Sequence, residues 1–110
     1  MYPCHSSMDR IAALRTMLEA NPANHFARYG LALELVKIGD DRSALAEFRR
    51  IMADNPDYQA AYFHAGKALE RLGEGDEARA IYVEGVKASF RTGNTHARSE
   101  LEAAIEEIPT

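Results

Sequence analysis

Four histidines and one cysteine are the side chains of this sequence with the chemistry to bind a transition metal. A zinc site needs such ligands about four residues apart on one helix, or a few residues apart in a short loop. Cys4 and His5 are adjacent near the start of the chain, but His25, His64 and His96 are far apart from one another in the sequence. This spacing does not suit a zinc site. We therefore predict no metal ligand and no cofactor.

The residue types that catalyse reactions also lack a suitable arrangement. The glutamates recur at helical surface intervals, which is typical of a solvated helix face rather than of a paired acid and base in a cleft. Gly73-Glu74-Gly75 follows a helical pattern and not a strand, so it indicates a turn between helices rather than a phosphate-binding loop. No serine or cysteine lies in a recognisable nucleophile motif. We predict that the chain is not an enzyme and has no catalytic residue.

Lys67 and Arg71 are the remaining candidates for specific chemistry. They stand one helical turn apart, so both could hold one acidic group of a partner. The alternative is a solvated basic turn, since exposed charges of this kind commonly contribute no specific contact.

Composition and charge narrow the class of protein. The chain has 110 residues, 46% of them hydrophobic and 27% charged, which suits one soluble globular domain. A formal net charge of -4 argues against a nucleic-acid surface and disfavours an anionic membrane as partner. No stretch is apolar enough to span a membrane, and residues 1–7 lack the features of a secretory signal. Cys4 is the single cysteine, which excludes an intramolecular disulfide, and we expect a cytoplasmic location.

One unit of the sequence is used twice. Asn21-Pro22 recurs as Asn55-Pro56, which gives a period of about 34 residues. When the second unit is laid over the first, similar residues coincide at spaced positions: Ala27 with Ala61, Leu35 with Leu69, Ile38 with Leu72, Gly39 with Gly73, Ala44 with Ala78, Ala46 with Ala80, and Phe48 with Tyr82.

Apolar periodicity within and around these units predicts helices throughout. A tail (1–7), which we expect to be flexible, precedes a flanking helix (8–20) that Ser7 or Asp9 can cap. Two helical hairpins follow, over 22–55 and 56–91, and Gly39 and Gly73 are placed to end their first helices. A last helix over 94–108 has a narrow apolar stripe and a glutamate-rich opposite face, as a capping element should. We predict one domain over 8–110.

The period and the residue pattern resemble the tetratricopeptide repeat (TPR) family. The pattern of this family has a large residue, Leu, a small residue and an aromatic in the first helix, and Ala, an aromatic, Ala and Pro in the second. The first unit matches with Leu31, Ala32, Leu35, Ala44, Phe48, Ile51 and Pro56, and the second with Tyr62, Ala65, Gly66, Leu69, Ala78 and Tyr82. Two departures are Arg28, in place of a large aromatic, and Phe90, in place of a third proline. The resemblance implies an all-α fold of TPR-type hairpins that form a short right-handed solenoid.

The same resemblance implies where a partner would bind. In this family the first helices of successive repeats line a concave surface, which here would form a groove carrying Phe26, Tyr29, Leu33, Lys37, Phe63, His64, Lys67 and Arg71. The aromatic residues of this set could instead pack on the N-terminal helix or on the tail. One subclass of the family holds a C-terminal carboxylate with lysine and asparagine side chains. Tyr29, Leu33 and His64 occupy those positions here, so that clamp is absent.

Two functions follow from the resemblance. The first is a non-catalytic scaffold or adaptor that binds a segment of another protein in the groove, with Lys67 and Arg71 selecting an acidic neighbour. The second is a structural homo-oligomer, such as a homodimer, because a short solenoid has open ends that a second copy could bury.

Overall fold

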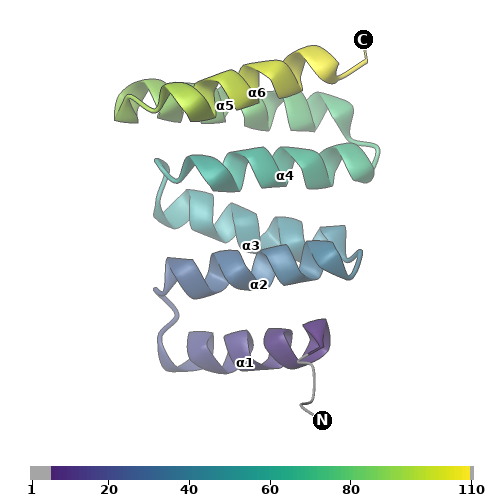
Figure 1. The fold of residues 1–110 in the computed structure, drawn as a ribbon, viewed down its shortest axis with the longest axis vertical. Coiled ribbons are helices and arrows are strands. Elements are labelled where there is room, and N and C mark those ends of the chain that lie inside the picture. Colours follow the sequence, from purple (N-terminus) through teal and green to yellow (C-terminus); the bar gives the residue numbers. More distant parts are fainter. Residues whose placement is uncertain (1–5, 110) are drawn as a thin grey trace.

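A computed structural model describes residues 6–109, and all regular structure within this range is helical (Figure 1). This confirms the predicted all-α fold. The six helices are α1 (Ser7–Ala20), α2 (His25–Lys37), α3 (Asp41–Asp54), α4 (Gln59–Arg71), α5 (Gly75–Thr92) and α6 (Thr95–Glu107). None of them is both long and apolar enough to cross a lipid bilayer.

Side-chain caps and left-handed glycines set the helix boundaries. Asn24, Asp40 and Asn94 each accept a hydrogen bond from a backbone N–H in the first turn of α2, α3 and α6. The chain turns after α2, α4 and α5 at glycines whose φ angles are 84°, 81° and 70°, a conformation that side chains disfavour. The short connections that result allow only antiparallel neighbours.

The first helix begins earlier than the sequence predicts. Ser6 is its N-cap and forms a reciprocal capping box with Asp9, so Ser6 and Ser7 belong to the folded domain and not to a tail. The expected cap at Ser7 or Asp9 was wrong, because Asp9 is the third helical residue and its carboxylate accepts a hydrogen bond from the Ser6 backbone. The rest of the expected tail, including Cys4 and His5, lies outside the described residues.

The helices stack into an elongated body of 46 × 27 × 24 Å (Figure 1). α2 pairs with α3 and α4 with α5, and each hairpin packs on the next through α3 and α4. α1 packs on α2 at one end, while α6 packs on both α5 and α4 at the other. In Figure 1, α2, α4 and α6 lie on the near side of the stack and α3 and α5 lie behind them. α6 therefore occupies the place of the first helix of a third hairpin, which is more than a cap.

The core lies between the two layers of helices, as the repeat pattern predicts. Leu35, Phe48 and Tyr82 are at most 2% exposed. Gly66 gives Tyr82 its place, because a Cβ built on Gly66 would lie 2.1 Å from the Tyr82 ring. In the first unit Ala32 stands at the position of Gly66 and the smaller Phe48 at that of Tyr82. Small and large residues are thus matched across each hairpin.

Arg28 takes over the role of the aromatic residue that it replaces. Tyr62, its counterpart in the second unit, donates a hydrogen bond from its hydroxyl to the Pro56 carbonyl at 2.8 Å. Arg28 donates from Nη2 to the Pro22 carbonyl at 3.0 Å and pairs through Nη1 with a carboxylate of α3 at 2.6 Å. Each side chain therefore ties the proline that opens its repeat to the first helix. Although Arg28 departs from the family pattern, it keeps the hydrogen bond to the proline carbonyl with a different donor.

Candidate partner-binding groove

Equivalent positions of α2, α4 and α6 form rows across the near face of the stack. The offset from α2 to α4 equals the repeat period, and the offset from α4 to α6 is slightly longer, because α5 is longer than α3. The rows that result are Phe26–Ala60–His96, Gly30–His64–Glu100, Leu33–Lys67–Ala103 and Lys37–Arg71–Glu107. A segment that binds this face would contact one row after another.

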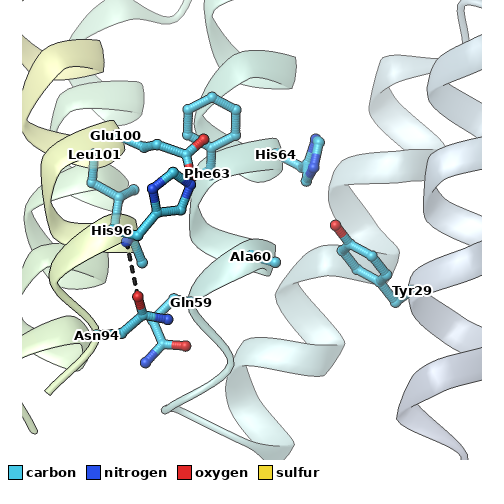
Figure 2. Close-up of a pocket in the computed structure, with 10 residues that line it drawn as sticks. Tyr29, Gln59, Ala60, Phe63, His64, Asn94, His96, Glu100 and Leu101 are labelled. Carbon is cyan, nitrogen blue, oxygen red and sulfur yellow. Dashed lines mark hydrogen bonds and ion pairs between the residues drawn. The ribbon is translucent and has the colours of Figure 1, made fainter. Parts of the chain in front are cut away.

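A hollow of about 430 Å³ opens on this face between α2, α4 and α6. Figure 2 shows Tyr29 on the α2 side of the hollow, His64, Phe63 and Ala60 on α4, and His96 and Glu100 on α6. Ala60 stands in α4 at the position that Phe26 has in α2. Gln59, Asn94, Ala97 and Leu101 complete the lining. A second hollow of about 310 Å³ lies beside it and shares Phe63 and Glu100; its other walls are Lys67, Ala103, Ala104 and Glu107.

Aromatic rings make the floor of the larger hollow. The His64 ring lies 5.8 Å from both the Tyr29 and the Phe48 ring centroids and 5.5 Å from the Phe63 centroid. Tyr29 also packs against Tyr58 at 5.4 Å. Each ring packs against at least one other ring, so the floor is already formed in the absence of a partner. A preformed apolar surface of this kind avoids much of the ordering cost of binding.

His64 is kept neutral by its surroundings. Burial among the rings lowers its pKa below the ordinary value of 6.5, and the positive charge of Arg71 lowers it further, while Glu100 acts weakly in the opposite direction. The floor of the hollow is therefore uncharged at neutral pH.

Because His64 resists protonation only in the folded chain, acid should destabilise the fold through this residue. Below pH 6.5 the unfolded chain binds a proton at His64 before the folded chain does, so the free energy of unfolding falls as the pH falls toward the folded-state pKa. The slope from this one group reaches at most about 1.4 kcal/mol per pH unit. Between pH 7 and 5, we expect the free energy of unfolding, measured with urea, to fall less steeply for His64→Phe than for the wild type. Equal slopes for the two proteins would contradict a neutral, half-buried His64.

Lys67 and Arg71, expected to select an acidic group, are already engaged with carboxylates of the chain. Arg71 Nε pairs with Asp41 of α3 at 2.9 Å. Lys67 Nζ lies 3.7 Å from Glu70 and 3.9 Å from Glu107, and 5.5 Å from the Phe63 ring centroid. These contacts do not support their proposed part in recognising an acidic neighbour.

The structure brings some of the predicted groove residues together and leaves others apart. Tyr29, Phe63 and His64 line the larger hollow, and Lys67 lines the smaller one. The others line neither hollow: Phe26 is 82% exposed near the start of α2, Leu33 is half-buried against the core, and Lys37 and Arg71 are exposed. Whether any of them contacts a partner stays a prediction.

The α6 residues of the groove were missed by the sequence reasoning. The last helix was interpreted as a cap, so Asn94, His96 and Glu100 were assigned no role in the groove, although they form one wall of the larger hollow. The N-cap residues carried a signal that α6 is equivalent to α2. Asn24 and Asn94 stand at equivalent helix starts, but the longer second offset hides this from a search at a fixed period.

The polar side chains that α6 adds to the groove are exposed. His96 Nε2 lies 3.0 Å from a Glu100 carboxylate oxygen, and both side chains are open to solvent. Across residues 6–109, no group of three histidine, cysteine, aspartate or glutamate side chains is gathered as a metal site would require. Aromatic faces, amide groups and the Glu100 carboxylate are groups that can hold a side chain of a partner.

Comparisons with known proteins place this fold in a family. The sequence profile described as tetratricopeptide repeat matches residues 5–85. A TPR repeat-containing protein of Pseudomonas aeruginosa is 26% identical over 98 residues, which cover 89% of this chain and 93% of that protein. The crystal structure of a tetratricopeptide repeat domain protein from Salinibacter ruber is 35% identical with a TM-score of 0.73, and the match covers 77% of this chain and 94% of that one. A solution structure from Bordetella parapertussis shares the fold at 23% identity and a TM-score of 0.78, covering 89% and 85%. The match to the family profile, over well more than half of the sequence, shows that the chain belongs to the tetratricopeptide repeat family.

Proposed function

We propose that this protein is a non-catalytic scaffold or adaptor that binds a segment of another protein in the groove formed by α2, α4 and α6. Domains of this family generally mediate protein–protein interactions. The observation that carries the proposal for this groove is the larger hollow, with its aromatic floor of Tyr29, Phe63 and His64.

The hollow suits the side chain of a bound segment. Its volume of about 430 Å³ lies within the range of about 300–1,000 Å³ that is usual for ligand pockets. Aromatic walls supply much of the binding energy at protein interfaces, because they bury a large area with few rotatable bonds. The amide side chains of Gln59 and Asn94 lie at the same hollow and can bond the backbone of an extended segment.

A single substitution can fill the hollow without disturbing the core. Ala60 is exposed and lines the hollow, so Ala60→Trp should occupy the space that a partner side chain needs. Ala53→Trp is the matched control, because Ala53 is an exposed alanine of α3 that lines neither hollow. We expect a tagged wild-type chain, purified from its own cells, to retain a partner that Ala53→Trp also retains and Ala60→Trp loses by at least tenfold. Circular dichroism should show equal helicity for all three.

Other outcomes would reject the groove or favour another function. A partner retained equally by Ala60→Trp would contradict binding at this hollow. Recovery of only untagged copies of the same chain, with light scattering that shows a concentration-dependent mass, would support the homo-oligomer hypothesis instead.

A further inference from the structure

We infer that the segment bound in this groove is basic, and that a lysine or arginine side chain of the partner lies between the Phe63 ring and the Glu100 carboxylate. This inference rests on the proposed function of the groove and specifies the chemistry of its partner. It reverses the acidic partner that the sequence suggested from Lys67 and Arg71.

The charges on the groove favour a cation. Of the described residues that line the larger hollow, Glu100 is the one carboxylate, and no lysine or arginine takes part. The smaller hollow adds the carboxylate of Glu107 and the ammonium of Lys67. The side chains of Glu100 and Glu107 are 49% and 71% exposed, so their charges remain accessible to a partner. Two carboxylates against one ammonium leave the joined lining negative.

The aromatic ring shared by the two hollows also attracts a cation. Lys67 Nζ already lies 5.5 Å from the Phe63 ring centroid, which is within the range of a cation–π contact. The same ammonium is 3.7 Å and 3.9 Å from its two carboxylate partners, longer than a good charged hydrogen bond. A guanidinium or ammonium that enters from a partner can therefore replace Lys67 at the ring without breaking a tight internal pair. It can share the exposed carboxylate of Glu100 with His96, whose Nε2 lies 3.0 Å from one carboxylate oxygen.

Arg71 and His64 of α4 do not offset this preference. Arg71 is held by Asp41 at 2.9 Å, where the aspartate side chain is only 14% exposed. His64 carries no charge at neutral pH, because burial keeps its pKa low. An acidic partner residue would therefore meet the two carboxylates of α6 with only the ammonium of Lys67 to offset them, and the net repulsion lowers affinity.

The spacing of the two carboxylates predicts a spacing in the partner. Glu100 and Glu107 are seven residues apart on α6, which is two helical turns and about 10 Å along the axis. An extended peptide covers about 10 Å in three residues. We therefore expect two basic residues three positions apart in an extended segment, with an apolar side chain near them for the aromatic floor.

A random library of dodecapeptides displayed on phage, selected on the whole chain, tests this inference. The test variant is Glu100→Gln with Glu107→Gln, which removes both charges and keeps the shape of the side chains. The control is Glu102→Gln with Glu106→Gln, because these two exposed glutamates are on the same helix but line neither hollow. Circular dichroism should show the same helicity for both variants as for the wild type.

We expect the peptides selected on the wild type to be enriched in arginine and lysine at the predicted spacing. The affinity of the best peptide, measured by fluorescence anisotropy, should fall about tenfold for the test variant and change less than twofold for the control. Binding to the wild type should weaken as salt is raised. Two results would overturn the inference and leave the proposed function standing. In both, the selected peptides bind the wild type but not Ala60→Trp. Either these peptides are acidic, or they bind the test variant as tightly as the wild type. If every selected peptide also binds Ala60→Trp, or if no peptide is selected, the proposed function is contradicted. The inference, which rests on that function, is then contradicted as well.

Discussion

Gly66→Ala should be among the most destabilising single-methyl changes in this protein, with a loss of about 3 kcal/mol in the free energy of unfolding. The added Cβ would lie 2.1 Å from Cε1 and 2.5 Å from Cζ of Tyr82, closer than any real contact between such atoms. Tyr82 cannot move aside, since it is fully buried and its hydroxyl donates a hydrogen bond to Glu70. The clash must therefore push α5 away from α4, which opens the core of the second hairpin.

Gly30→Ala is the matched control, and we expect it to raise the free energy of unfolding where Gly66→Ala lowers it. A Cβ at Gly30 would meet Leu14 of α1 at 3.5 Å, an ordinary van der Waals distance. Alanine is favoured over glycine inside a helix, so this change should stabilise the protein by about 0.5–1 kcal/mol. In thermal unfolding we expect a lower midpoint for Gly66→Ala, by more than about 10 °C, and a slightly higher one for Gly30→Ala.

The cost at Gly66 should also depend on Tyr82. In a Tyr82→Leu background the added methyl group meets a smaller side chain, so the loss from Gly66→Ala should shrink by more than half. If the two losses simply added, or if Gly66→Ala melted like the wild type, the close approach of α4 and α5 would not be the reason for this glycine.

Leu101→Ala should release α6 and remove one wall of the groove. Leu101 is 1% exposed and packs against α5, where a Cβ built on Gly85 would lie 3.0 Å from Leu101 Cδ1. Truncating a buried leucine costs about 2–5 kcal/mol. Because α6 packs only on α5 and α4 within the described chain, much of this loss should appear as local opening of the last helix.

Hydrogen exchange would detect this opening. We expect the amides of α6 to exchange about 100-fold faster in Leu101→Ala, while those of α2 and α3 change little. A peptide or partner that binds the groove should also lose affinity, since His96 and Glu100 are carried by α6. Glu102→Ala is the control, because Glu102 is an exposed residue of the same helix whose ion pair with Arg98 lies on the surface. Uniform loss of protection across all helices would mean that α6 cannot open by itself.

Some departures from the family pattern could be interpreted only with coordinates. Arg28 stands in place of a large aromatic residue, and it donates a hydrogen bond to the Pro22 carbonyl as Tyr62 does to the Pro56 carbonyl. Phe90 removes the proline that would end α5, and the helix runs on to Thr92. The extra length explains the longer offset that concealed the role of α6. In each case the sequence showed a departure from the family pattern, and the structure showed what that departure does.

The helices, the repeat and the core could all be predicted from the amino-acid sequence. These features depend on local signals, such as caps and glycines, and on a repeat period that places Leu35, Phe48, Gly66 and Tyr82 at matching interior positions. The groove, in contrast, required the packed helices. Its larger hollow is walled by residues of α2, α4 and α6, and Arg71 beside it is paired with Asp41 of another hairpin. Such pairings join residues that are far apart along the chain, so they follow from how the helices stack and not from any local pattern.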